Sequence, residues 1–198
     1  MPRIFKRLAL LTSIAAAFAA DKDKAAFRPP PLTSLEHRQT NAQITIGVDP
    51  YASPDKAKTA FGKLDPYQYG VLPVLVVIQN DSGKTIRVDK LKAEYVGPHG
   101  DRVDATPAKD VRYVRGPNRP GVITGPGGTP KILSKKNPLD AWEIEGRAFA
   151  AQMLPAGQSA SGFFYFRTGL QRGATIYLNG LTEAATGKEL FYFEIPLQ

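Results

Sequence analysis

The chain contains no cysteine, and this absence excludes several kinds of chemistry at once. Disulfides cannot stabilise the fold, although small exported domains often depend on them. The acylated cysteine of a bacterial lipoprotein and the thiolate ligands of many zinc sites are also missing. The hydrophobic core must therefore stabilise the protein.

Histidine is scarce as well, with only His37 and His99 in 198 residues. A zinc or copper site needs several nitrogen, sulfur or carboxylate ligands that converge on one point. His99 lies in the turn sequence Gly97-Pro98-His99-Gly100, where we expect a solvated side chain. The sequence predicts neither a metal site nor a cofactor.

Long apolar runs are also absent. The strongest one, residues 8–20, is well short of the roughly 20 residues that a membrane-spanning helix needs. It follows Arg3, Lys6 and Arg7 and ends in the small residues of Ala17-Phe18-Ala19, so residues 1–19 are predicted to be a cleaved signal peptide. We expect an exported protein, periplasmic or extracellular, with no transmembrane span in its mature form.

Positive charge is concentrated in one segment. The formal net charge is +8. Residues 109–136 carry seven lysines and arginines against the single carboxylate of Asp110. The part from 116 to 137 is also rich in proline and glycine, so we expect a long basic loop without regular structure.

The mature chain is predicted to have a flexible lead-in over residues 20–42 and a single domain over residues 43–198. A strand is expected at 43–48, where Ile44, Ile46 and Val48 alternate with other residues. The pattern Ser53-Pro54-Asp55 predicts a short helix over 54–61. A second short helix is expected after Pro138, with Leu139 and Trp142 on one face, although residues 143–149 also alternate like a strand.

The remaining pattern is that of short strands. The strongest strand pattern covers residues 72–96. Both faces of its run at 74–78 are apolar, which is typical of a central strand. We expect a turn at 80–83 and a hairpin with the stretch that begins at Ile86. Further strands are expected at 147–154, 162–166, 174–181 and 189–197, with Phe191, Phe193 and Ile195 on one face. Six to eight strands without long helical crossovers predict an all-β antiparallel sandwich.

No reactive constellation is evident. Gly83-Lys84-Thr85 lacks the preceding glycine and the following helix of a phosphate-binding loop. Ser159 and Ser161 have no elbow motif. The ring-rich segments at 163–166 and 191–193 would suit a carbohydrate platform, but neighbouring strands rich in rings are more typical of a sandwich core. Export argues against nucleic acid as a partner.

Two segments carry a resemblance to a known group of proteins. Residues 72–82 end a strand in Asn80-Asp81-Ser82, and residues 154–163 pass from Pro155-Ala156-Gly157 into an aromatic strand. Both resemble exported bacterial immunoglobulin-like domains. Residues 43–197 as a whole resemble uncharacterised secreted proteins of soil bacteria. The resemblance implies an immunoglobulin-like β-sandwich and an exported location, and it supplies no catalytic residue.

Two hypotheses of function follow. The first is an exported, non-catalytic sandwich that contacts an anionic envelope component or a partner protein through its basic loop. The residues expected to make that contact are Arg112, Arg115, Arg119, Lys131, Lys135 and Lys136. The alternative is a hydrolase acting on envelope or extracellular polymers, which would need two facing carboxylates. The candidates for that role are Glu143, Glu145, Asp101 and Asp104.

Overall fold

The computed structural model describes residues 27–114 and 137–197, and it describes the backbone alone of residues 121–124 and 130–133. The predicted signal peptide lies outside these residues. So do Arg115, Arg119, Lys135 and Lys136 of the predicted basic site.

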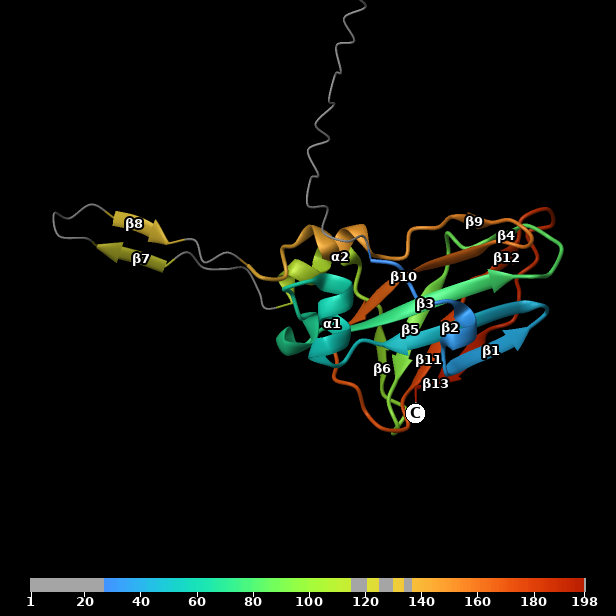
Figure 1. Ribbon diagram of the computed structural model, residues 1–198, viewed down its shortest axis with the longest axis horizontal. Helices are drawn as coiled ribbons and strands as arrows, with labels where there is room; N and C mark the ends of the chain where they lie inside the picture. Colours follow the sequence, from blue (N-terminus) through green and yellow to red (C-terminus); the bar gives the residue numbers. More distant parts are fainter. Residues whose placement is uncertain (1–26, 115–120, 125–129, 134–136, 198) are drawn as a thin grey trace, which may run out of the picture.

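Two four-stranded antiparallel sheets form the body of the protein (Figure 1). The first sheet has the order β1-β2-β3-β10, with strands β1 (His37–Asn41), β2 (Ile44–Pro50), β3 (Leu72–Asn80) and β10 (Ser159–Phe166). The second has the order β13-β11-β5-β6, with strands β13 (Phe193–Pro196), β11 (Thr175–Asn179), β5 (Lys92–Val96) and β6 (Arg102–Asp104). The all-β antiparallel sandwich expected from the sequence is confirmed.

Two smaller sheets and a few short helices complete the described structure. A three-stranded sheet joins β12 (Thr182–Glu183), β4 (Ile86–Arg87) and β9 (Met153–Leu154), and β7 (Gly121–Thr124) pairs with β8 (Pro130–Leu133). The α-helices are α1 (Pro54–Phe61) and α2 (Trp142–Gly146), and the 3-10 helices are η1 (Leu32–Ser34), η2 (Pro66–Tyr69) and η3 (Ala108–Tyr113).

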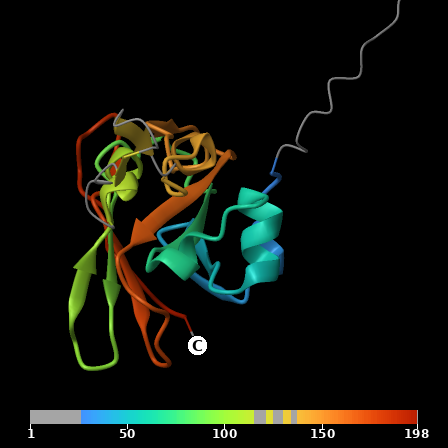
Figure 2. The same ribbon diagram turned by 90° about the vertical axis from the view of Figure 1, so that its left-hand side faces the viewer.

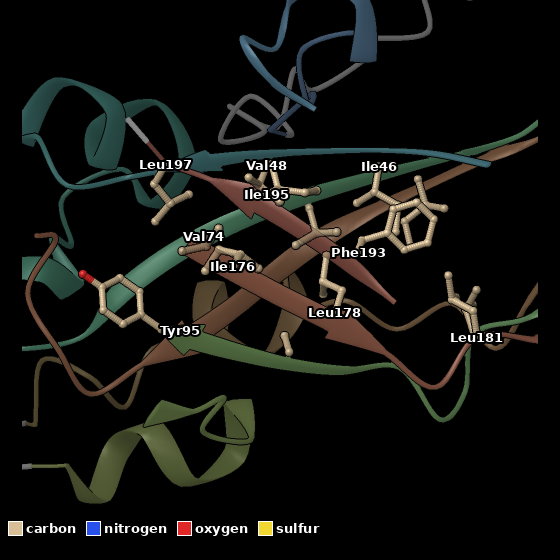
Figure 3. Close-up of a cluster of buried hydrophobic side chains, with 14 of the residues drawn as sticks. Ile46, Val48, Val74, Tyr95, Ile176, Leu178, Leu181, Phe193, Ile195 and Leu197 are labelled. Carbon is tan, nitrogen blue, oxygen red and sulfur yellow. The ribbon is translucent and has the colours of Figure 1, made fainter. Parts of the chain in front are cut away.

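The main core lies between the two large sheets. Ile46, Val48 and Val74 of the first sheet meet Ile176 and Phe193 of the second, and all five side chains are buried (Figure 3). Alternate residues of each strand point into this layer, as the period-two pattern of the sequence predicted. Because no disulfide is available, this apolar burial is the main source of stability.

A second core covers the other face of the first sheet. Leu75, Phe163 and Tyr165 point away from the sandwich and pack against Phe61 of α1 and Ile144 of α2. Figure 2 shows α1 on one side of the first sheet and the second sheet on the other. Strand β3 is therefore buried on both faces, as its sequence predicted.

Helix α1 has the bounds and caps that the sequence predicted. The Ser53 side chain accepts a hydrogen bond from the Lys56 backbone N–H, and Pro54 occupies the first helical position. Gly62 ends the helix with a φ of 65°, in the left-handed region that favours glycine.

Several expectations are wrong. Strand β3 forms no hairpin with the strands that follow it, because β2 and β10 occupy its two edges and the chain crosses after Asn80 into other sheets. Residues 37–41 of the supposed lead-in form β1. The stretch expected to lack regular structure contains the β7–β8 pair, where Val122 lies opposite Ile132.

Three further segments differ from expectation because their regular elements are shorter than predicted. Helix α2 begins only at Trp142, so buried Leu139 and exposed Trp142 share no helical face. Strand β13 begins at Phe193, which leaves Phe191 outside the alternation and 67% exposed. Of the strand expected at 147–154, only Met153 and Leu154 form β9.

Candidate functional site

A polar groove of about 730 Å3 crosses the first sheet on the face that also carries the helices. Its floor comes from all four strands of that sheet. One wall is the segment from Pro29 to Thr33, which runs over the sheet before β1. The groove is therefore built by a regular sheet on one side and, on the other, by a proline segment that leads into η1.

The pairing register places polar side chains of the floor in one row. Thr40 lies opposite Thr45, Thr45 lies opposite Gln79, and Gln79 lies opposite Ser159. Because opposite residues on neighbouring strands point to the same face, these four side chains cross the sheet side by side. The row spans three strand spacings, a length of about 14 Å.

The neighbouring row contains the positive charge of the groove. Arg38 lies opposite Gly47, which lies opposite Val77, and Ser161 completes the row. Gly47 makes room for the wall, because a Cβ atom there would lie 2.6 Å from a methyl carbon of Leu32 and 2.7 Å from one of Leu35. A glycine in β2 thus lets residues 32–35 pack closely on the sheet.

Hydrogen bonds fix the orientation of several groove side chains. Arg38 Nη1 donates to the Thr33 carbonyl oxygen at 2.8 Å. Gln79 Nε2 donates to Asp81 Oδ1 at 2.9 Å, so its amide oxygen is left to accept. The hydroxyls of Thr40 and Thr45 are 2.9 Å apart. The floor of the groove therefore presents hydrogen-bond donors and acceptors in fixed orientations.

Some polar groups of the groove have no partner within the part of the chain that the structure describes. Arg38 makes no ion pair there, and the hydroxyls of Ser159 and Ser161 make no hydrogen bond. All three residues are exposed. The two serine hydroxyls, and the N–H groups of Arg38 other than those of Nη1, are therefore available to a ligand without breaking an existing contact.

The predicted basic site is only partly described. Arg112 Nη1 lies 2.9 Å from Asp140 Oδ1, and Nη2 bonds Glu145 Oε1. The hydrogen bond to Glu145, and then the charge of Asp140, raise the pKa of the Arg112 guanidinium. Two carboxylates thus already balance its charge, and Arg112 joins η3 to the α2 region. Only the backbone of Lys131 is described, in β8.

The carboxylates of the hydrolase hypothesis form two pairs on different elements. Glu143 and Glu145 belong to α2, where Glu145 is engaged by Arg112. Asp104 lies in β6, and Asp101 lies just before that strand, both exposed. His99 is exposed in its turn, as expected. Within the described residues, no group of three histidine or carboxylate side chains is placed to hold a metal ion.

Sequence reasoning missed the groove because it assigned Arg38 and Thr40 to a flexible lead-in. Strand β1 is polar along its whole length, so it shows no apolar alternation. The turn after it gives no signal either, since Ala42 and Gln43 adopt φ values of 49° and 59° at positions where glycine or asparagine is usual. The strand can be identified only from its pairing with β2.

The aromatic residues mostly form core, as predicted. Phe163, Tyr165, Phe166 and Phe193 are buried. Tyr192 is an exception, because its exposed ring lies 5.2 Å from that of Tyr177 on β11.

In the described ranges, no helix combines the length and the apolar character needed to cross a membrane.

Comparisons with known proteins find similarity to solved structures and to no family model or curated protein. A solved structure of the secreted protein MPT63 from Mycobacterium tuberculosis is similar, with a TM-score of 0.34 and 14% sequence identity over 83% of this chain and 95% of that chain. A likeness at this level supports no statement about function. The immunoglobulin-like topology and the resemblance to secreted proteins of soil bacteria stay predictions.

Proposed function

We propose that this protein is an exported, non-catalytic binding module whose polar groove holds an extended, hydroxyl-rich chain with an acidic group, of the uronic-acid oligosaccharide class. The row Thr40–Thr45–Gln79–Ser159 across the groove floor is the observation that carries this proposal. Export is the part of the proposal that rests on the predicted signal peptide.

The chemistry of the floor suits such a ligand. Hydroxyl and amide side chains both donate and accept hydrogen bonds, and so do sugar hydroxyls. Regular strands hold these groups, so little additional ordering is needed when a ligand binds. The row is about 14 Å long, which favours an extended chain over a compact small molecule.

Arg38 explains the preference for an acidic ligand. One nitrogen of its guanidinium is held by the Thr33 carbonyl oxygen, and the remaining N–H groups have no carboxylate partner among the described residues. A guanidinium binds a carboxylate through two parallel hydrogen bonds. The proposal retains the anionic partner expected from the sequence. Its contact is Arg38 in place of Arg112.

The absence of catalysis is part of the proposal. The two carboxylates of α2 lie on a different element from those in and just before β6, and glycoside hydrolysis requires two carboxyl groups on either side of one bond. Asp81, the carboxylate of the groove, accepts a hydrogen bond from Gln79 and has no acidic neighbour among the residues that line the floor.

The test is a calorimetric titration with two hexasaccharides, oligogalacturonate and uncharged maltohexaose. We expect the protein to bind oligogalacturonate at least tenfold more tightly than maltohexaose. Arg38→Gln should abolish this preference, and Thr45→Val should weaken binding of both sugars because it removes a hydroxyl and conserves the shape of the side chain.

Arg172→Gln is the matched control. Arg172 is exposed and lies outside the groove, and its replacement removes the same charge as Arg38→Gln. The Arg172→Gln variant should bind oligogalacturonate with the same affinity as the unchanged protein. The groove proposal is overturned if neither sugar binds. It is equally overturned if binding survives Arg38→Gln and Thr45→Val but is lost when Lys135 and Lys136 are replaced by alanine, because the basic segment would then be the site.

A further inference from the structure

A second hollow of different character is lined by the β1–β2 turn, by residues in and before β4, and by the segment from β12 to β13. Strands β4 and β12 lie at the end of the sandwich far from α1 (Figure 1). This apolar pocket has a volume of about 510 Å3. Its lining includes buried Ile44 and Ile86, and also Leu190 and Phe191 from the segment before β13. It shares no lining residue with the polar groove.

Phe191 is both a wall of this pocket and a projecting apolar group. Two thirds of its surface is exposed, the highest value among the large apolar side chains described as exposed. The Phe191 ring and the pocket lining both expose apolar surface to water. Burying either surface would lower the free energy. An exposed apolar ring and an apolar hollow thus lie on the same surface.

The rim of the pocket carries both signs of charge in equal number. Lys84 and Glu183 pair with each other, with nitrogen and oxygen 3.1 Å apart. Lys188 and Glu189 are exposed and make no ion pair with any described residue. A rim of balanced charge does not favour an anionic amphiphile, but it suits a surface that carries the same pair in reverse order.

A two-fold axis supplies such a surface. In a two-fold dimer the same patch faces itself, so a contact from Lys188 to Glu189 occurs twice, and so does a contact from Phe191 to the pocket. We infer that this end of the sandwich is an interface between two copies of the chain, with Phe191 of each copy seated in the apolar pocket of the other.

The neighbouring backbone is consistent with a fixed docking edge. The β1–β2 turn lines the pocket with Ala42 and Gln43, both of which adopt left-handed φ values that side chains other than glycine rarely take. The Asp81 backbone N–H holds this turn by donating to the Gln43 carbonyl oxygen at 2.9 Å. The turn is thus anchored and does not need to be ordered on association.

Sedimentation equilibrium of the purified chain over a range of concentrations tests the inference. We expect a monomer–dimer equilibrium that Phe191→Ser weakens at least tenfold. Tyr113→Ser is the matched control, because Tyr113 is 60% exposed in η3 and lies outside the pocket. Its dimerisation should be unchanged.

Charge exchange distinguishes an interface from a general loss of solubility. Lys188→Glu alone should weaken the dimer, because it places like charges opposite each other. Lys188→Glu combined with Glu189→Lys should restore it. Circular dichroism of each variant verifies that the fold is retained.

Three results would overturn the inference. The first is a protein that remains monomeric at millimolar concentration. The second is a dimer that Phe191→Ser leaves intact. The third is a monomer that binds a fluorescent fatty acid in a Phe191-dependent manner, which would make a lipid the occupant. Because the groove and the pocket share no lining residue, sugar binding by a monomer would leave the proposed function standing while this inference fails.

Discussion

Apart from tyrosines, Asn80 is the only buried residue with a polar side chain among the residues whose burial is described. Its Nδ2 donates to the carbonyl oxygens of Lys84 at 2.7 Å and Leu154 at 2.9 Å. Its Oδ1 accepts from the hydroxyl of Ser82 at 2.6 Å. One side chain thereby closes the turn after β3 and joins it to β9, which lies far away in the sequence.

Replacing Asn80 with alanine is expected to lower the free energy of unfolding by about 2–4 kcal/mol, because the buried carbonyl oxygen of Leu154 and the half-buried one of Lys84 lose their donor and a small cavity remains. Urea denaturation measures the change. Asn179→Ala is the control, since the Asn179 side chain makes no hydrogen bond with the rest of the described protein. A loss for Asn80→Ala no larger than that of the control would contradict this role.

At the scale of elements, the close approach of residues 147–149 to β10 determines how α2 sits on the first sheet. Phe163 N–H donates to the Arg147 carbonyl oxygen at 2.8 Å, and Phe149 N–H donates to the Phe163 carbonyl oxygen at 3.1 Å. Gly162 permits this contact, because a Cβ atom there would lie 2.5 Å from the Phe149 backbone nitrogen. A glycine in the strand therefore fixes the position of the helix.

Gly162→Ala should destabilise the protein by about 1–3 kcal/mol, because the new methyl group meets backbone that must shift as a unit. Hydrogen exchange should show faster exchange in α2 and at the Phe149 amide, with little change at the interface between the two large sheets. Gly169→Ala serves as the comparison, since a Cβ atom there would make an ordinary contact of 3.6 Å with Tyr67 Oη. Equal effects of both substitutions would refute the explanation.

At the scale of the whole molecule, buried tyrosines link stability to alkaline pH. Burial, and then the charge of Asp49, raise the pKa of Tyr51 to about 12. Burial also raises the pKa of Tyr165, whose hydroxyl donates to the Ile144 carbonyl oxygen at 2.7 Å. The ordinary pKa of tyrosine is about 10. Above that pH, the unfolded chain loses protons that the folded protein keeps.

The stability of the protein should therefore be unaffected by these tyrosines below about pH 10 and should fall as the pH rises from 10 to 12. Each buried tyrosine contributes a slope of about 1.4 kcal/mol per pH unit. Urea midpoints at a series of pH values measure the decline, and phenolate absorbance should rise together with unfolding. Tyr51→Phe should make the decline shallower, and an unchanged slope would exclude Tyr51 as a cause.

The sequence by itself determined the features that depend on neighbouring residues. The alternation in β2 and the continuous apolar and aromatic runs in β3 and β10 identified strands, and the Ser53-Pro54 cap fixed the start of α1. The lack of cysteine required an apolar core. These signals are local, because side chains two residues apart share a strand face and a cap acts within one helical turn.

Only the tertiary structure decided which strands pair and what their pairing builds. Strand β3 lies between β2 and β10, and nothing in residues 72–96 distinguishes that arrangement from a hairpin with the next strand. Strand β1 has no apolar pattern, so neither it nor the groove beside Arg38 was predictable. Phe191 continues the alternation of β13 in sequence but is exposed at a pocket in space. Contacts between distant segments depend on how the whole chain packs, so the local periodicity of the sequence cannot predict them.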